Sequence, residues 1–314
     1  MDDYHRLRLV AAVQDGVITA EQCRAHGVSP QQVKTWCRDK RWRRLNRGVY
    51  LVDADLHAEP PRRSLIRAAV LSAGPNAVAV LSTAAELHGL AGLRTDSAIH
   101  LSLPVANARP RRMCEPDLRL HQFVLRPQDI MTIDGIPATT PTRTVADLML
   151  TVDRYSAVCV LDSGLNRGIL GPDDLPLIGE LLFGRRGATK ARGWLAEADG
   201  RADSPLETRI RLRCVDGEIP PDSLQFPVFD SDGGLIAICD LAWEGPRIVA
   251  EGDGIEAHDN PSAVFRDRVR QNALVNAGYH PLRFTWPDTM RAGYIPGVVR
   301  EATVRIAARG TQPS

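Results

Sequence analysis

The stretch TAEQCRAHGVSPQQVKTWCRDKRWRRLNRGVYLV, residues 19–52, decides the fold of the N-terminal part of the chain. Thr19 and Ser29 are each followed three residues later by a glutamine, which is the pattern of a capping box and predicts that a helix begins after each. Gly27 can supply the left-handed residue that ends the first helix, and Pro30 suits the first position of the second. Two short helices joined by about four residues predict a helix-turn-helix.

The segment RWRRLNRGVYLV, residues 41–52, predicts a β-hairpin directly after these helices. NRG is a turn signal, and the residues on either side are rich in Trp, Val and Tyr. Val33, Trp36 and Cys37 fall on one face of the second helix and are expected in the core. Residues 1–56 are therefore predicted to form a winged helix.

Basic residues are concentrated in this region. Between Lys34 and Arg47 there are seven basic residues and one acid, Asp39. Such a surface can pair with phosphates, and a helix fits the major groove, which favours double-stranded DNA as the partner over a solvated basic face or a protein-interaction module. The candidate DNA-binding residues are Lys34, Thr35, Arg38, Arg41, Arg43, Arg44 and Arg47.

The middle of the chain, residues 62–200, is predicted to be a mixed α/β domain that follows a proline-bearing linker at 57–63. We find no catalytic constellation in it. Helices are expected over 62–73, 80–89, 153–167 and 172–183 and from Pro141 onward, and strands at 98–104 and 118–125.

The last predicted domain, residues 203–310, begins with a helix after Ser204, where Glu207 completes a capping box. Strands follow in LIAICDLAW and RIVAEGD, then a helix capped by Asn260, a strand in HPLRFTW and a helix over 296–308.

Acidic residues cluster around those two consecutive strands. Residues 230–259 contain eight acids and one base, Arg247. Neighbouring strands lie ~4.8 Å apart, so carboxylates on both strands can come close together. Because like charges repel each other, such a group needs a proton or a bound cation to be stable. Oxygen ligands suit Mg²⁺ or Mn²⁺, which catalyse phosphodiester hydrolysis. A solvated loop after a strand explains the same acids without a site.

Two resemblances extend these interpretations. The helix-turn-helix followed by RWRRLNRGVYLV resembles the N-terminal domain of AbiEi-type antitoxins, with weaker similarity to about residue 200. That resemblance implies sequence-specific DNA binding, autorepression and a cognate toxin as partner. The motifs SPLE, CDLAW and VAEGDG resemble the PD-(D/E)XK nuclease superfamily, closest to its Vsr-like branch, over residues 203–308.

The nuclease resemblance implies a role for each matching residue. Asp240 and Glu251 would be metal ligands, and Asp253 would stand where that superfamily usually has a lysine. The supporting residues would be Glu207 beside the metal, His258 as a proton carrier, and Arg266 and Arg270 on the phosphates of the cleaved strand. The missing lysine after Glu251 and the glycine at Gly252, which we interpret as relaxed packing, favour a nuclease fold that no longer cuts.

Composition and length set the outer limits. The 314 residues suggest two or three domains, the net charge of +1 indicates no partner, and the six cysteines are scattered without a C-x-x-C pair. No signal peptide or apolar run long enough to span a membrane is present, so we expect a cytoplasmic protein with no membrane contact and no organic cofactor.

The predicted fold class is thus α+β multidomain, with a winged helix, a mixed α/β middle region and a restriction-endonuclease-like α/β core. Two functions compete: a metal-dependent DNA endonuclease, and an AbiEi-like autorepressor or antitoxin whose last domain does not cut. A protein-interaction role for the winged helix is a third, which the basic run from Lys34 to Arg47 disfavours.

Overall fold

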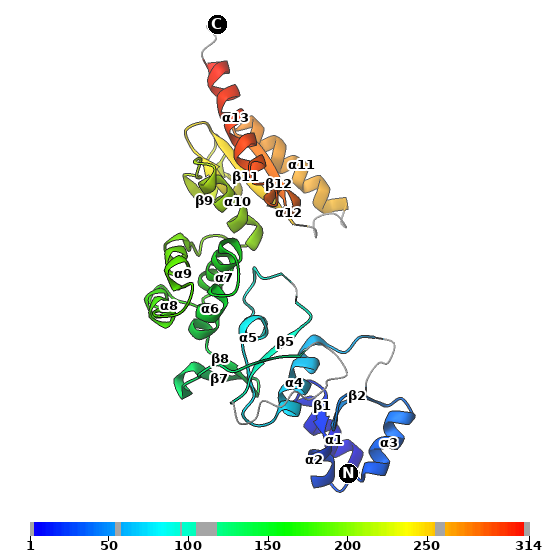
Figure 1. The fold of residues 1–314 in the computed structure, drawn as a ribbon. Coiled ribbons are helices and arrows are strands. Elements are labelled where there is room, and N and C mark those ends of the chain that lie inside the picture. Colours follow the sequence, from blue (N-terminus) through cyan, green and yellow to red (C-terminus); the bar gives the residue numbers. More distant parts are fainter. Residues whose placement is uncertain (1–2, 54–57, 95, 105–117, 255–260, 311–314) are drawn as a thin grey trace. The chain divides into compact units, whose positions relative to one another are not determined.

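The computed structural model describes residues 3–53, 58–94, 96–104, 118–254 and 261–310. The chain divides into two compact units (Figure 1). Unit 1 contains residues 1–90 and 94–148, and unit 2 contains residues 91–93 and 149–314. Among the described residues, no helix is both long enough and apolar enough to cross a bilayer.

Unit 1 begins with the predicted winged helix. Its elements are α1 (Asp3–Ala12), β1 (Val17–Thr19), α2 (Ala20–Ala25), α3 (Pro30–Arg38), β2 (Trp42–Asn46) and β3 (Val49–Val52), and the strands form a sheet in the order β1-β3-β2. Both predicted capping boxes are present, at Thr19 and Ser29, and Gly27 has a φ of 78°. The winged-helix prediction is therefore confirmed, whereas α1 and β1 were not predicted.

The three-stranded sheet of the winged helix is covered on both faces. Leu7 of α1, Cys23 of α2 and Val33 of α3 pack with Trp42 in one buried cluster. Leu45, Val49 and Leu51 instead join a second cluster with Ala68 of α4 (Arg62–Ala73). The wing is thereby fixed to the helix that begins the next part of the chain.

The other face of α4 packs on a five-stranded sheet of order β6-β5-β4-β8-β7, where Ile66 and Ala69 lie among the buried residues. Two helices that flank it, α5 (Leu81–His88) and α6 (Pro141–Met149), begin where predicted. The sequence analysis missed the hairpin turn at Asp134–Gly135, where both residues have positive φ, as an Asp-Gly turn between strands requires. The strands are β4 (Val78–Ala79), β5 (Ile99–Ser102), β6 (Leu118–His121), β7 (Ile130–Ile133) and β8 (Ile136–Thr139), and the short helix η2 spans Pro127–Asp129.

Unit 2 opens with a helical region: α7 (Arg154–Asn166), α8 (Asp174–Leu182), α9 (Ala188–Trp194) and the short η3 (Leu195–Glu197). The buried carboxylate of Asp162 on α7 accepts hydrogen bonds from the Thr208 hydroxyl and the Arg211 guanidinium, both 2.8 Å away. Thr208 and Arg211 belong to α10 (Pro205–Asp216), so this polar contact joins the helical region to the domain that follows.

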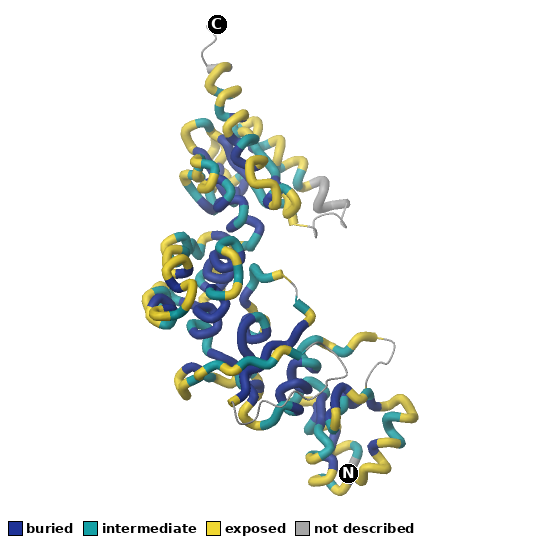
Figure 2. Tube along the Cα trace, in the orientation of Figure 1, coloured by how far each residue is buried: buried dark blue, intermediate teal, exposed yellow. Residues whose placement is uncertain are grey.

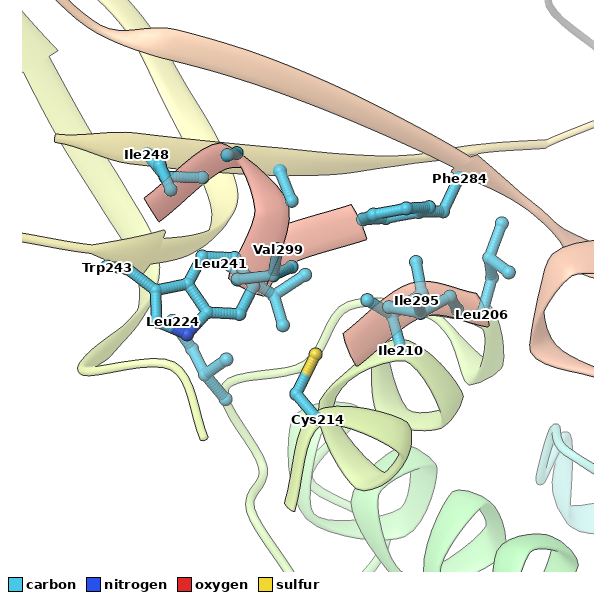
Figure 3. Close-up of a cluster of buried hydrophobic side chains, with 12 residues drawn as sticks. Leu206, Ile210, Cys214, Leu224, Leu241, Trp243, Ile248, Phe284, Ile295 and Val299 are labelled. Atoms are coloured by element: carbon cyan, nitrogen blue, oxygen red, sulfur yellow. The ribbon is translucent and has the colours of Figure 1, made fainter. Parts of the chain in front are cut away.

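The last domain has a four-stranded sheet of order β12-β11-β10-β9, in which β9, β10 and β11 run antiparallel and β12 is parallel to β11. Leu206 and Ile210 of α10 and Val299 of α13 pack on one face of this sheet (Figure 3). Leu274 of α11 packs on the other, among residues that include Val249. The elements are β9 (Ser223–Phe229), β10 (Leu235–Trp243), β11 (Ile248–Asp253), α11 (Pro261–Asn276), β12 (His280–Thr285), α12 (Trp286–Thr289) and α13 (Tyr294–Gly310).

Every predicted helix and strand of this domain is present, and one strand, β9, was not predicted. β9 lies at the edge of the sheet and contains Pro227, which counts against a strand when the sequence is considered alone. The main elements follow the order helix, three antiparallel strands, helix, parallel strand and helix. The domain is therefore a mixed α/β structure. Its assignment as an endonuclease-like core stays a prediction.

Candidate nucleic-acid interface and acidic site

Helix α3 presents the charged face that the sequence analysis predicts. Val33 is buried, and Trp36 and Cys37 pack against the core of the winged helix. Lys34 and Arg38 are exposed on the remaining surface, and Thr35 is half-buried. The colours of Figure 2 show that much of the N-terminal part is exposed or half-buried. The burial of one side of this helix leaves the other side, with its two cations, available to a ligand.

The two neighbouring arginines of β2 differ in their surroundings. Arg44 pairs with Tyr50, which belongs to the core under α1, α2 and α3, and the Arg44 guanidinium opposes the rise that burial causes in the pKa of the Cys37 thiol. Arg43 pairs with Leu51 on the α4 side, is half-buried, and donates a hydrogen bond to the carbonyl oxygen of Ala58 (3.1 Å). Arg44 therefore shares a side of the sheet with α3, whereas Arg43 does not.

Two further predicted cations are exposed near the same strands. Arg41 lies over the ring of Tyr4, with its guanidinium carbon 4.0 Å from the ring centroid. Arg47 is exposed in the turn that joins β2 to β3. We use the name basic surface for the exposed predicted cations of the winged helix, which are Lys34, Arg38, Arg41, Arg44 and Arg47.

The predicted acidic site lies where β10 and β11 separate. Their backbone pairing runs from Trp243↔Ile248 to Leu241↔Ala250. Beyond these pairs, the Asp240 carboxylate accepts a hydrogen bond from the backbone amide of Gly252 (2.8 Å). A side-chain oxygen therefore takes the place that a backbone carbonyl of β10 would have in a continued ladder. Burial raises the pKa of the Asp240 carboxyl, and this hydrogen bond opposes the rise.

Glu207 of α10 is, like Glu251, a carboxylate on which the charge of Asp240 acts. Its carboxylate accepts hydrogen bonds from the backbone amide of Asp203 (2.9 Å) and the side-chain amide of Gln225 (3.0 Å). The predicted capping box is therefore altered. The Ser204 side chain accepts a hydrogen bond from the Glu207 amide, but the Glu207 carboxylate accepts one from the amide of Asp203 instead of that of Ser204. Burial, followed by the charge of Asp240, raises the pKa of Glu207 to about 7.

Glu251 and Asp253 are neutralised by arginines. Glu251 forms an ion pair with Arg270 of α11, and Asp253 accepts hydrogen bonds from the Nε of Arg283 on β12 (2.9 Å). Arg283 also pairs with Asp267 of α11. Burial raises the pKa of Glu251, and Arg270 offsets only part of that rise, to which the charge of Asp240 also contributes.

The predicted metal site has an incomplete ligand set in the described part of the chain. No group of three or more His, Cys, Asp and Glu side chains there is arranged to hold a metal ion. Asp240 and Glu207 come together, but Arg270 engages Glu251 instead of a phosphate. Arg266 is exposed on α11, and His258 lies outside the described residues. The metal ligands predicted at Asp240 and Glu251 therefore stay a prediction.

Two residues of this site escaped the sequence analysis. Gln225 lies on the unpredicted strand β9, and Arg283 was treated only as part of HPLRFTW. The parallel register places Arg283 directly opposite Glu251. A charged residue inside a predicted strand was the available signal for Arg283, since such residues are depleted in strands unless paired. No comparable signal marked Gln225.

Gly252 has a packing role that we had interpreted wrongly. An added Cβ at this position would lie 3.0 Å from the side chain of Leu206 on α10. The glycine therefore lets α10 approach β11 closely, which is the reverse of relaxed packing.

Family models match two segments of the chain. Residues 5–52 match the family described as "Transcriptional regulator, AbiEi antitoxin", and residues 77–195 match the "AbiEi antitoxin C-terminal domain". Both matches fall within the predicted AbiEi-like part, and neither reaches the last sheet. The Vsr-like resemblance of that last domain has no corresponding match among these families.

Two relatives come from Mycobacterium tuberculosis. The uncharacterized proteins MT2308 and Rv2248, from two strains, are each 31% identical to this chain over 244 residues, which cover 78% of this chain and 85% of theirs. The crystal structure of the Rv2827c protein, from the same species, is similar with a TM-score of 0.42 and 14% identity over 67% of this chain and 80% of that one, too weak a likeness to decide fold or function. The chain belongs to the family of these uncharacterized mycobacterial proteins, and its first 195 residues contain the AbiEi antitoxin N-terminal and C-terminal domains.

Proposed function

We propose that this protein is a DNA-binding transcriptional regulator of the AbiEi antitoxin type, which represses its own promoter and acts together with a cognate toxin. The observation that carries the proposal is the basic surface: exposed cations on α3, β2 and the β2–β3 turn of a winged helix whose sequence matches an AbiEi regulator family. Cations at such positions can pair with the phosphates on either side of a major groove that receives α3.

The proposal is tested by gel shift or fluorescence anisotropy with the duplex DNA upstream of the gene, beside a shuffled duplex of the same length. Wild-type protein should prefer the upstream duplex, and the double variant Arg38→Ala plus Arg44→Ala should bind both duplexes more weakly, because these cations are proposed to pair with phosphates. Lys190→Ala is the matched control, because Lys190 is an exposed cation of α9 in the other unit. Equal binding of the two duplexes by wild type would contradict sequence-specific regulation.

DNA cleavage is a second candidate function, and one observation favours it. Glu207 is a buried carboxylate whose pKa is raised by burial and by the charge of the half-buried Asp240, and a bound cation would favour the charged form of both. The arginines on Glu251 and Asp253 count against it, because they already neutralise two of the carboxylates that the resemblance assigns to catalysis.

Incubation with supercoiled plasmid and Mg²⁺ or Mn²⁺ separates the two functions. We expect no nicking by wild-type protein. Nicking that is lost in Asp240→Ala and in Glu251→Ala would establish the endonuclease, whereas nicking that persists in both variants would come from a contaminant.

A further inference from the structure

A surface of arginine and aromatic side chains lies on unit 2, where α7, α10 and α12 meet. We call it the Trp286 surface, and it consists of Tyr155, Arg209, Arg213, Trp286 and Met290. Arg209 and Arg213 lie four residues apart on α10, with their guanidinium carbons 5.1 and 4.5 Å from the centroid of the Tyr155 ring. Arg209 also lies 5.1 Å from the centroid of Trp286, so its guanidinium is placed between two rings.

The outer part of this surface is apolar and open. Trp286 is 39% exposed and Met290 is 60% exposed. Trp286 and Met290 thus leave apolar surface open to a ligand beside the guanidinium of Arg209.

The arginines of the surface retain unused hydrogen-bonding capacity. Arg154, on the neighbouring turn of α7, is held by Glu197 and Asp216. Within the described ranges, Arg209 has no carboxylate at ion-pair distance: its Nη2 lies 3.9 Å from the sulfur of Met290, and its buried Nε has no acceptor. Its guanidinium also opposes the rise that burial causes in the pKa of the Cys159 thiol. Arg213 donates to the carbonyl oxygen of Thr289 (2.7 Å), likewise without a carboxylate partner there.

The local acids are engaged elsewhere. Asp153, whose pKa the Arg209 charge helps to lower, caps the first turn of α7 through the amide of Ser156 (3.1 Å). Asp288 accepts a hydrogen bond from the amide of Thr285 (2.8 Å). The two α10 guanidiniums are therefore the groups of this surface that an external anion can use.

We propose that the Trp286 surface binds single-stranded nucleic acid, with an unpaired base stacked on the indole of Trp286 and an adjacent phosphate on the guanidinium of Arg209. An exposed ring beside a planar cation suits this ligand, because every base has a face that can stack and every nucleotide brings a phosphate. In a duplex the base faces are hidden, so the strand must be unpaired. A protein partner needs about 800 Å² on each side, more than one tryptophan and one methionine supply.

This site is distinct from the basic surface of the winged helix and does not depend on the proposed regulatory function. The two are separable because the Trp286 surface should hold unpaired strands of any sequence, whereas the winged helix should select one duplex.

The test measures the anisotropy of a labelled oligothymidylate of about 12 nucleotides, within the site sizes of known single-strand binders, with full-length protein at low salt. Trp286→Ala and Arg209→Ala should each weaken binding at least about fivefold, since one base–aromatic stack is worth about 1–3 kcal/mol. Trp286→Phe should retain most of the affinity, because a ring remains. Phe183→Ala is the matched control: Phe183 directly follows α8 in the same unit, is 75% exposed, and its replacement should change nothing.

Several outcomes would overturn the proposal. Unchanged binding by a Trp286→Ala protein with wild-type circular dichroism and melting temperature would do so. Loss of binding in Arg38→Ala plus Arg44→Ala, with retention in Trp286→Ala, would show that the winged helix holds the strand, which leaves the regulatory function standing. Unchanged oligothymidylate binding together with lost self-association in Trp286→Ala, measured by light scattering, would make this a protein contact.

Discussion

The Asp240 carboxylate accepts a hydrogen bond from the backbone amide of Gly252 over 2.8 Å, at the point where pairing between β10 and β11 ends. The contact satisfies an amide beyond the last cross-strand pair, and it holds a half-buried carboxylate whose charge acts on Glu207. Two consequences can be measured: the proton affinity of Glu207 and the tight packing at Gly252.

Glu207→Gln should make stability less dependent on pH. The pKa of Glu207 is about 7 in the folded protein, against about 4.5 when exposed, so the folded state binds this proton more tightly than the unfolded state does. The contribution of this proton to the free energy of unfolding is fully present below pH 4.5 and is lost as pH rises through 7. Between pH 5 and pH 8, the free energy of unfolding of wild type should therefore fall by about 2–3 kcal/mol relative to that of the variant, measured by urea unfolding.

Glu301→Gln is the control for that experiment, because Glu301 is an exposed carboxylate of α13 in the same domain. It should follow the wild-type pH curve. A Glu207→Gln curve parallel to wild type from pH 5 to pH 8 would mean that Glu207 titrates as an exposed glutamate.

Gly252→Ala should destabilise the C-terminal domain by about 1–3 kcal/mol, the usual cost of overpacking. The new Cβ would lie 3.0 Å from the Leu206 side chain, which is itself buried against the sheet. Urea unfolding checks this, beside Gly245→Ala, where nothing lies within 4 Å of an added Cβ. Partial recovery in Gly252→Ala plus Leu206→Val would identify the Leu206 contact as the cause, and equal stability of both glycine variants would refute it.

Arg67→Ala should destabilise unit 1 far more than Arg63→Ala does, although both arginines bond to Asp15. The Arg67 side chain is 5% exposed, bonds to the Asp15 carboxylate (2.8 Å) and donates to the carbonyl oxygen of Asp134 (2.6 Å). Without Arg67, the Asp15 carboxylate and the Asp134 carbonyl oxygen lose a hydrogen-bond donor in a largely buried place. This loss should lower the free energy of unfolding by about 3 kcal/mol. The Arg63 side chain is 35% exposed, so its loss should cost about 1 kcal/mol or less. Thermal and urea unfolding of the two variants give the comparison, and equal losses would contradict it.

Arg44→Ala and Arg43→Ala should differ in how they change duplex binding. Arg44 belongs to the basic surface, so its removal should lower the slope of log affinity against log salt by about one. Arg43 is half-buried and bonded to the Ala58 carbonyl, so its removal should leave that slope near wild type. Anisotropy titrations of the upstream duplex at several salt concentrations decide this. A lower slope for Arg43→Ala, with an unchanged slope for Arg44→Ala, would mean that the side of β2 with Arg43 faces the DNA.

The winged helix could be predicted in detail because its signals are local. Capping boxes at Thr19 and Ser29 depend on residues three apart, and the Arg47–Gly48 turn depends on neighbours. The helix α1 was missed because Leu7 and Ala11 acquire their meaning only when a core exists to bury them.

The acidic site could be predicted only in part. Sequence spacing correctly predicted the helix and the two strands that carry Glu207, Asp240 and Glu251. It could not show that Arg270 and Arg283, distant in the chain, neutralise Glu251 and Asp253, because each pairing depends on how α11 and β12 meet β11.

The sequence by itself thus determined the local elements and the charge of the winged helix, since backbone capping, turns and side-chain periodicity act over a few residues. Only the tertiary structure decided which charged groups are free to bind. It placed Arg43, half-buried, on the α4 side of the sheet while leaving Arg44 exposed. It also gave Glu251 an arginine partner while leaving Arg209 without a carboxylate in the described residues. The physical reason is that the electrostatic state of a side chain is set by neighbours brought to it through folding, whatever their distance along the chain.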